Sequence, residues 1–397
     1  MRRTAIFITA ALGIALIVGA FLLSRDESDG VNATLSVAEA MGGDTTGYAR
    51  AQSRRVFSFP EDHGPHPEYK TEWWYFTGNL TSDSGRRFGY QFTIFRIALT
   101  PDGPDSISAG TWETNQLYMG HFTVTDVEGD EHHAFERLSR GAAGLAGAKA
   151  EPFRVWLENW SIEGTSSVAF PAMRVRASDE DAGIDIMLKP LKPVVLQGDQ
   201  GFDRKGPEPG NASYYYSLTR MQTDGSVRIG EEVFRVSGLS WMDREWSTSA
   251  LGENQIGWDW FSLHLSNGWD LMYYQIREEG GTVSPFSSGV LVSPEGAKIE
   301  LDRDDVGLDV LDRWKSPDGG VYPVAWRLRV PGEDLDLNIR SLVEDQELNV
   351  AVRYWEGAVD VEGTAARHPV KGSGYVELTG YADGEQGGGR SERREAF

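Results

Sequence analysis

Between residue 55 and about residue 381, short apolar runs alternate with clusters of Gly, Asp, Asn and Pro. The runs are rich in Val, Ile, Phe, Tyr and Trp, and residues 227–236 and 325–330 alternate apolar and polar side chains. Turn sequences such as Pro101-Asp102-Gly103 and Thr223-Asp224-Gly225 separate the runs. Helical periodicity is almost absent. This pattern predicts an all-β chain built from hairpins.

An internal echo indicates two related β units. Two segments share the order of an aromatic run, a glycine turn, a second aromatic run and an arginine. They are Trp74-Tyr75-Phe76, Gly85, Tyr90-Gln91-Phe92 and Arg96, and then Trp260-Phe261-Ser262, Gly268, Tyr274-Gln275-Ile276 and Arg277. We therefore predict an N-terminal domain over residues 55–230 and a C-terminal domain over residues 231–383. Closing each sheet into a barrel would remove exposed edges and could enclose an apolar ligand.

The N-terminus predicts export. Two arginines precede an apolar run from Ala5 to Leu23, and charged residues end it. This pattern is typical of a signal peptide or a signal-anchor helix, and the length of the run favours the anchor. We expect the body of the protein to be periplasmic or otherwise extracytoplasmic, anchored to the inner membrane by residues 4–23. The expected segments are the signal (1–25), a polar linker (26–54) and a disordered C-terminal tail (384–397).

The net charge, the absence of cysteine and the absence of two common motifs reduce the number of possible classes of function. A formal net charge of −22 argues against a nucleic-acid partner, because such binding depends on clustered Lys and Arg. The chain has no cysteine, which excludes disulfides and thiolate metal sites. It also lacks a G-x-S-x-G nucleophile motif and a glycine-rich phosphate loop. We expect no cofactor, and the sequence leaves the oligomeric state open.

The stretch from Phe57 to Arg96 joins a loop of acids and imidazoles to a run of aromatic residues. A carboxylate, Glu72, beside so much aromatic surface suits an apolar ligand handled by few polar groups. In the loop, His63 and His66 could hold a metal if they converge, although we expect no metal. They could also line a pocket mouth, or belong to a loop that caps a strand through Asp62. The aromatic run comprises Trp73, Trp74, Tyr75 and Phe76.

A second dense motif, SWMDREWS, follows residue 239. Asp243 and Glu245 are two residues apart, so on a strand they share one face while Arg244 lies on the other. We expect two tryptophans, Trp241 and Trp246, beside the two carboxylates. Desolvation there could keep one carboxyl protonated, as a general acid requires. A structural pair of salt-bridged carboxylates is the alternative.

A third motif, GWDWFSLH, begins at residue 257. Strand alternation places Trp258 and Trp260 on the same face. Both could line a pocket or simply fill a core, since large aromatic side chains dominate protein interiors. The same two interpretations apply to His121, Tyr215 and Tyr216.

Several uncommon motifs resemble the AttH-like family, a lipocalin-like family that includes the CrtC-type carotenoid 1,2-hydratases. In chain order they are FPEDHGPHPEYKTEWWYFTGNL, YYYSLTRM, WMDREWS, GWDWFSLHLSNGWDLMYYQIR and YWEGAVDVEGTAARHPVKGSGYVELTGY. The resemblance covers about Arg55 to Tyr381. It implies an all-β fold of two lipocalin-like (calycin-like) antiparallel β-barrel domains, and related fungal proteins act on polyene substrates as cyclases. Arg244 departs from the family, in which this position is more often His.

The motifs and the resemblance support two functions. A carotenoid-hydratase-like enzyme would add water to an isoprenoid C=C bond, with Asp243 as proton donor, Glu245 or His63 holding the water, and aromatic faces stabilising a cation. A non-catalytic carrier or transport accessory of the cell envelope would use the same pocket. In both, the expected partner is an apolar isoprenoid, carotenoid or lipid. The expected pocket residues are Trp73, Trp74, Tyr75, Trp241, Trp246, Trp258, Trp260, His121, Tyr215 and Tyr216.

Overall fold

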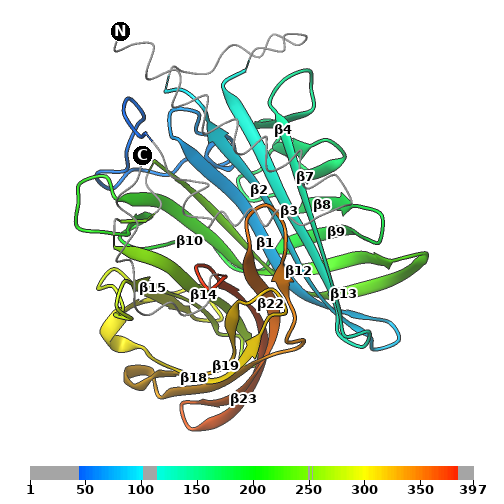
Figure 1. The fold of residues 1–397 in the computed structure, drawn as a ribbon, viewed down its shortest axis with the longest axis vertical. Coiled ribbons are helices and arrows are strands. Elements are labelled where there is room, and N and C mark those ends of the chain that lie inside the picture. Colours follow the sequence, from blue (N-terminus) through cyan, green and yellow to red (C-terminus); the bar gives the residue numbers. More distant parts are fainter. Residues whose placement is uncertain (1–43, 102–113, 249–250, 253, 383–397) are drawn as a thin grey trace, which may run out of the picture.

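The computed structural model describes residues 44–101, 114–248, 251–252 and 254–382 (Figure 1). The expected signal segment, the first part of the expected linker and the expected tail lie outside these ranges. The end of the expected linker packs on the folded chain, since Ala51 is buried and the Ala49 N–H donates to the Glu68 carbonyl at 3.0 Å. Within the described ranges, no helix is both long and apolar enough to cross a membrane.

The fold is all-β, as the hydrophobic pattern predicts, and consists of two barrel-like antiparallel sheets. The described residues contain three single-turn 3-10 helices, η1 (Glu61–His63), η2 (Arg303–Asp305) and η3 (Pro331–Glu333). The first sheet has thirteen strands and curls until β4 contacts β6. Its strands are β1 (Thr71–Ser82), β2 (Arg87–Ala98), β3 (Gln116–Asp126), β4 (Glu131–Arg140), β5 (Ala146–Lys149), β6 (Arg154–Leu157), β7 (Trp160–Gly164), β8 (Met173–Ser178), β9 (Ala182–Pro190), β10 (Val195–Leu196), β11 (Phe202–Arg204), β12 (Ala212–Ile229) and β13 (Glu232–Ser247).

The second sheet has ten strands and forms a half-barrel. Its order is β17-β16-β15-β14-β23-β22-β20-β19-β18, with β21 beside β22, and that of the first sheet is β4-β3-β2-β1-β13-β12-β9-β8-β7-β6-β5, with β10 and β11 beside β12. The strands of the second sheet are β14 (Gln255–Leu265), β15 (Asp270–Glu278), β16 (Ser288–Val292), β17 (Lys298–Asp302), β18 (Gly307–Lys315), β19 (Val321–Val330), β20 (Leu335–Ser341), β21 (Glu347–Leu348), β22 (Tyr354–Ala365) and β23 (His368–Leu378).

The two sheets repeat one strand order, in which the first strand lies between the second strand and the last. Accordingly β1 pairs with β2 and β13, and β14 pairs with β15 and β23. Each arginine that closes the sequence echo binds an acid on the first strand of its own sheet, because Arg96 binds Glu72 on β1 and Arg277 binds Asp259 on β14. The echo therefore marks a hairpin that both sheets repeat.

The sheets divide later in the chain than residues 230–231, where the sequence suggests a boundary. The strand after that point, β13, pairs with β1 and β12 in the first sheet. Gly230, with φ +53°, sits in the tight turn that joins β12 to β13, and such a turn resembles a linker in sequence. The division between the two sheets lies between Ser247 and Gln255.

The sheets pack against each other through a shared aromatic layer. Each sheet has its own apolar core, and a third cluster that includes Tyr75, Tyr215 and Trp260 lies between them. In Figure 1 the first sheet runs from blue to green and the second from yellow-green to red, with β1 and β22 close to their junction. Lys192 ties the two together through an ion pair of 2.8 Å with Asp270 on β15. A cavity remains inside this layer.

Candidate active site

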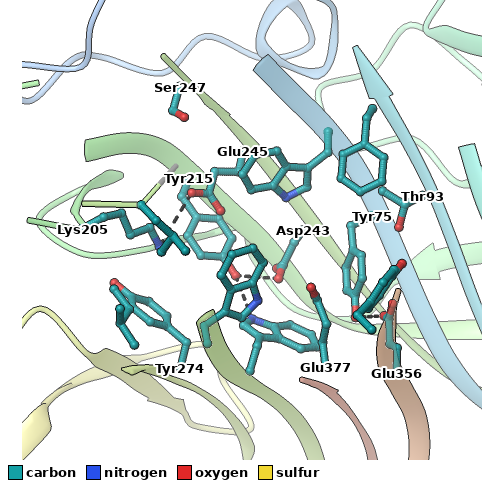
Figure 2. Close-up of a pocket in the computed structure, with 17 residues that line it drawn as sticks. Tyr75, Thr93, Lys205, Tyr215, Asp243, Glu245, Ser247, Tyr274, Glu356 and Glu377 are labelled. Atoms are coloured by element: carbon teal, nitrogen blue, oxygen red, sulfur yellow. Dashed lines mark hydrogen bonds and ion pairs between the residues drawn. The ribbon is translucent and has the colours of Figure 1, made fainter. Parts of the chain in front are cut away.

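The cavity between the sheets has a volume of about 100 Å³ and is lined by aromatic and ionisable side chains. Both sheets contribute, and they do so from equivalent strands: β1, β2, β12 and β13 in the first, and β14, β15, β22 and β23 in the second. The aromatic lining includes Trp73, Tyr75, Phe95, Tyr215, Trp258 and Trp260. The ionisable lining includes Asp243, Glu245, Lys205, Glu356 and Glu377 (Figure 2).

Asp243 lies on β13 and is held by three hydrogen bonds. Its Oδ1 accepts the Ser217 hydroxyl at 2.5 Å and the Trp241 indole N–H at 2.6 Å, and its Oδ2 accepts the Tyr215 hydroxyl at 2.5 Å. A carboxylate has four acceptor positions, so one position on Oδ2 remains for a proton. Burial raises the pKa of the Asp243 carboxyl to about 6, although the three hydrogen bonds act in the opposite direction.

Glu245 lies two residues further along β13 and faces Lys205. Its Oε1 is 3.7 Å from the Lys205 ammonium, which also binds Asp203 at 2.5 Å. Burial raises the pKa of Glu245 to about 7, and the charge of Lys205 limits the rise. Burial acts to lower the pKa of Lys205, but the carboxylates of Asp203 and Glu245 outweigh it and raise that pKa, so the ammonium stays charged.

Two further carboxyls enter the cavity from the second sheet. Burial raises the pKa of Glu377 to about 8; a hydrogen bond from Trp258 opposes the rise, and the charge of Asp243 adds to it. Burial and the neighbouring Glu377 raise the pKa of Glu356 well above its ordinary value. Glu356 accepts the Tyr75 hydroxyl at 2.5 Å, a contact that joins the two sheets. Burial therefore favours the protonated form of Glu377 more strongly than that of Asp243.

Seven of the residues predicted from sequence meet in this cavity. Asp243 and Glu245 face it together while Arg244 points away, which confirms the predicted alternation. Trp241 supports Asp243 from behind rather than lining the cavity. His121 does not line the cavity either, but its Nδ1 lies 2.8 Å from the hydroxyl of Tyr354, which does. The other predicted lining residues that do line the cavity are Trp73, Tyr75, Tyr215, Trp258 and Trp260.

The first aromatic run of the sequence echo is aligned one residue away from the equivalence that the structure shows. It equates Trp74 with Trp260, but Trp260 lines the cavity whereas Trp74 donates its indole N–H to the His63 carbonyl on the opposite face. The residues that face the cavity at equivalent positions are Trp73 with Trp258, and Tyr75 with Trp260. A shift of one residue moves a side chain to the other face of a strand, so the correction decides which aromatics can meet a ligand.

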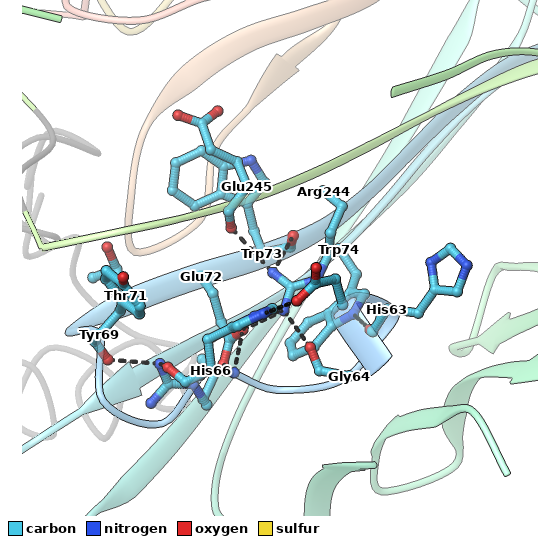
Figure 3. Close-up of polar contacts among 12 residues, drawn as sticks. His63, Gly64, His66, Tyr69, Thr71, Glu72, Trp73, Trp74, Arg244 and Glu245 are labelled. Atoms are coloured by element: carbon cyan, nitrogen blue, oxygen red, sulfur yellow. Dashed lines mark hydrogen bonds and ion pairs between the residues drawn. The ribbon is translucent and has the colours of Figure 1, made fainter. Parts of the chain in front are cut away.

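The opposite face of β1 and β13 carries a buried ion network instead of a ligand site (Figure 3). Glu72 is fully buried and binds both Arg244 and Arg96. Arg244 also donates to the Gly64 carbonyl at 2.6 Å, so the loop after η1 docks on this face. The loop therefore meets residue 244 and not Asp243. His66 stacks on Trp246 with ring centroids 3.8 Å apart.

Four predicted site residues belong to this structural face and not to the cavity: His63, Trp74, Tyr216 and Trp246. The two ring nitrogens of His63 contact the Tyr216 hydroxyl at 2.5 Å and the Ala169 carbonyl at 2.6 Å, and His63 does not line the cavity. It therefore cannot hold a water beside Asp243. Trp246 occupies an even position on β13, so alternation places it with Arg244 and away from the carboxylates. The interpretation of this loop as a structural cap is the one that the contacts support.

A metal at the paired imidazoles finds no support in the geometry. His63 binds Tyr216 and Ala169, whereas His66 binds Asp62 at 3.0 Å, so the two rings have separate partners. Among the described residues, no cluster of three or more His, Asp or Glu side chains has the arrangement of a metal site.

Sequence reasoning missed the acids of the second sheet and the lysine. Glu356 follows Tyr354 and Trp355. This carboxylate beside aromatic residues resembles the Glu72 motif, and the resemblance could have marked Glu356 as a candidate site residue. Glu377 and Lys205 have no such local signal, because their place in the cavity depends on how the sheets pack.

Comparison with known proteins places the chain in one family. The AttH-like family model matches residues 50–381, and the chain belongs to the AttH-like family. A crystal structure of a protein from Nitrosomonas europaea assigned to AttH is 32% identical, with a TM-score of 0.73, over 84% of this chain and 99% of that one. The family that the sequence motifs resemble is thereby confirmed.

Two relatives carry names that describe a reaction. The crystal structure of kievitone hydratase from Nectria haematococca has a TM-score of 0.63 at 17% identity, over 82% of this chain and 93% of that one, which shows a shared fold. The dehydratase asqC of Emericella nidulans is 23% identical over 230 residues. That match spans 55% of this chain and 64% of the relative's length.

Proposed function

We propose that the protein catalyses the addition of water to a carbon–carbon double bond of an apolar substrate, or the reverse reaction, in which loss of water forms that double bond. The observation that carries the proposal is that two carboxyls, Asp243 from the first sheet and Glu377 from the second, line one aromatic cavity. Burial raises the pKa of Glu377 above that of Asp243. Pairs of acids whose environments separate their pKa values are typical of acid–base catalysis. The names of two relatives, a hydratase and a dehydratase, support the same reaction class.

In the hydration direction Glu377 supplies the proton and Asp243 receives one. The Glu377 O–H protonates one carbon of the double bond, and the faces of Trp258 and Trp260 stabilise the cation on the other carbon. A water oxygen then bonds to that carbon while Asp243 takes its proton. Glu377 ends ionised and Asp243 protonated, and transfer of one proton between them through water resets the pair.

Dehydration is the reverse of these steps. Protonated Asp243 donates to the leaving hydroxyl, and ionised Glu377 removes the proton from the neighbouring carbon. The sequence predicts Asp243 as the proton donor in hydration; in this proposal Glu377 takes that role, and Asp243 is the donor in dehydration. Glu245 lies beside Asp243 on the same face and is placed to orient the water.

The volume of the cavity limits how much of a substrate molecule it can enclose. A volume of about 100 Å³ is below the range of about 300–1,000 Å³ of pockets that enclose whole drug-sized ligands. We therefore propose a compact isoprenoid-type molecule, or one end of a longer one such as a carotenoid or lipid. Export of the protein and its anchoring by residues 4–23 stay part of this proposal.

The test uses kievitone and an acyclic terpenoid as probes, in water labelled with oxygen-18. Wild-type protein should incorporate the label into at least one probe, and Asp243→Asn and Glu377→Gln should each lower turnover by about a hundredfold or more. Asp259→Asn is the matched control, since Asp259 is buried outside the cavity in the ion pair with Arg277. Undiminished turnover in both cavity variants would refute the assignment. An apolar ligand retained in native mass spectrometry, and unchanged on incubation, would favour the carrier instead.

A further inference from the structure

Lys205 brings a positive charge into a cavity that otherwise holds acids. Among the lining residues that the structure describes, it is the cationic side chain. Its Nζ lies 2.5 Å from Asp203 Oδ2, 3.7 Å from Glu245 Oε1 and 3.9 Å from the centre of the Tyr274 ring. In the view of Figure 2, Lys205 and Glu356 lie on opposite sides of Asp243. The reacting carbons beside Asp243 would thus have a charged donor to one side.

The position of Lys205 is fixed before any ligand arrives. Its backbone N–H donates to the Asn211 carbonyl at 3.0 Å, and its own carbonyl accepts the Gln255 side-chain amide at 2.7 Å. Its partner Asp203 is held in turn by the Tyr274 hydroxyl at 2.9 Å. A donor held in this way binds a ligand with little loss of side-chain entropy, so it is suited to positioning.

The ammonium has more donors than its surroundings use. It carries three N–H groups, and among the described residues it makes one hydrogen bond, to Asp203. Glu245 lies beyond hydrogen-bonding distance, and the Tyr274 ring occupies another side. Its side chain is 14% exposed, and it forms part of the cavity wall. At least one N–H is therefore available to an oxygen of a bound molecule.

The charge around Lys205 decides which kind of oxygen fits. Asp203 already neutralises the ammonium, and Asp243 and Glu245 line the same space, so a carboxylate or phosphate would meet repulsion from several sides. A neutral carbonyl oxygen accepts the N–H without that repulsion. A pure hydrocarbon would leave the buried donor unpaired.

We propose that Lys205 donates a hydrogen bond to a neutral carbonyl oxygen, so that the natural substrate is an apolar molecule with a carbonyl group near its reacting double bond. This inference rests on the proposed function, because it places the substrate in the same cavity. Lys205 acts in it as a positioning residue for the ligand.

The experiment measures binding, so that it does not depend on turnover. Dissociation constants of acetophenone, isopropylbenzene and benzoate are measured by calorimetric titration of the full chain. These probes present a ketone, its hydrocarbon counterpart and a carboxylate on one ring. They are compared in wild type, in Lys205→Met and in Lys192→Met. Lys192 is the matched control, because it too is a largely enclosed lysine paired with an aspartate, Asp270, but it does not line the cavity.

In Lys205→Met we expect the affinity for acetophenone, relative to isopropylbenzene, to fall by about tenfold or more, as for a lost hydrogen bond to a charged donor. In Lys192→Met the ratio should not change, and benzoate should bind wild type more weakly than acetophenone. Equal losses for ketone and hydrocarbon, an unchanged ratio, tighter binding of benzoate, or no binding of acetophenone to wild type would each overturn the proposal. If Lys205→Met misfolds, the double variant Asp203→Asn, Lys205→Met removes the unpaired carboxylate and allows the same comparison. Retention of the ketone preference in a protein without hydratase activity would refute the proposed function and leave the subsite standing.

Discussion

Replacing Glu245 with Gln tests whether the cavity destabilises the charged form of its acids. Glu245 is buried, and among the described residues Lys205 is the cation that pairs with its carboxyl, at 3.7 Å. Gln has nearly the same shape and cannot ionise. The variant therefore removes the ionisation of this acid and leaves the packing of the cavity in place.

The size of the effect follows from the pKa of Glu245. Burial raises that pKa from its ordinary 4.5 to about 7, so the folded protein holds this proton more tightly than the unfolded chain does. The stability that the proton contributes is fully present below pH 4.5 and is lost as the pH rises through 7. At about 1.36 kcal/mol for each tenfold change in proton affinity, the loss is about 3 kcal/mol. Glu245→Gln should not show this loss.

The assay is urea unfolding of wild type and Glu245→Gln at pH 5, 7 and 9. The free energy of unfolding of the variant, relative to wild type, should rise by about 2–3 kcal/mol from pH 5 to pH 9. Glu231→Gln, in the exposed turn between β12 and β13, controls for the change of residue type. A difference between variant and wild type that stays constant across the three pH values would refute the reasoning about burial.

Two further predictions follow from the ion network and from the acid pair. Arg244→Met should lower the free energy of unfolding by about 3–5 kcal/mol in urea, because Glu72 keeps its burial and loses one of its two arginines. Arg327→Met, which breaks an exposed pair, should cost less than about 1 kcal/mol, and equal losses in both variants would contradict this account. Hydration needs ionised Asp243 and protonated Glu377, so kcat should rise through pH 6 and fall through pH 8, and a rate that does not vary between pH 5 and 9 would exclude these roles.

The parts of the structure that depend on local pattern were predictable from sequence. The strands, the repeated hairpin and the shared face of Asp243 and Glu245 all follow from alternation along a strand, which sterics fix within a few residues. The same rule shows where the sequence interpretation was wrong. Trp246 is three residues from Asp243 and so cannot share its face, and the echo that equates Trp74 with Trp260 pairs an outward side chain with an inward one.

The parts that depend on packing between sheets were not predictable. Glu377 shares the cavity with Asp243 only because the sheet that contains β23 packs against the sheet that contains β13, and the two residues are more than 130 positions apart in the chain. His63 shows the converse. Its motif suggests a catalytic or metal-binding residue, yet its two ring nitrogens bind Tyr216 and Ala169. No local sequence pattern reveals these contacts.

The strand order that the two sheets repeat explains how one cavity contains two carboxyls with different pKa values. The last strand of each sheet supplies an acid to the cavity, Asp243 on β13 and Glu377 on β23, so the repetition of one strand order brings two carboxyls into one cavity. Their surroundings then differ. Asp243 accepts three hydrogen bonds, which favour its ionised form, whereas Glu377 has another buried carboxyl, Glu356, beside it. Symmetric architecture thus places the acids, and asymmetric neighbours divide them into a proton donor and a proton acceptor.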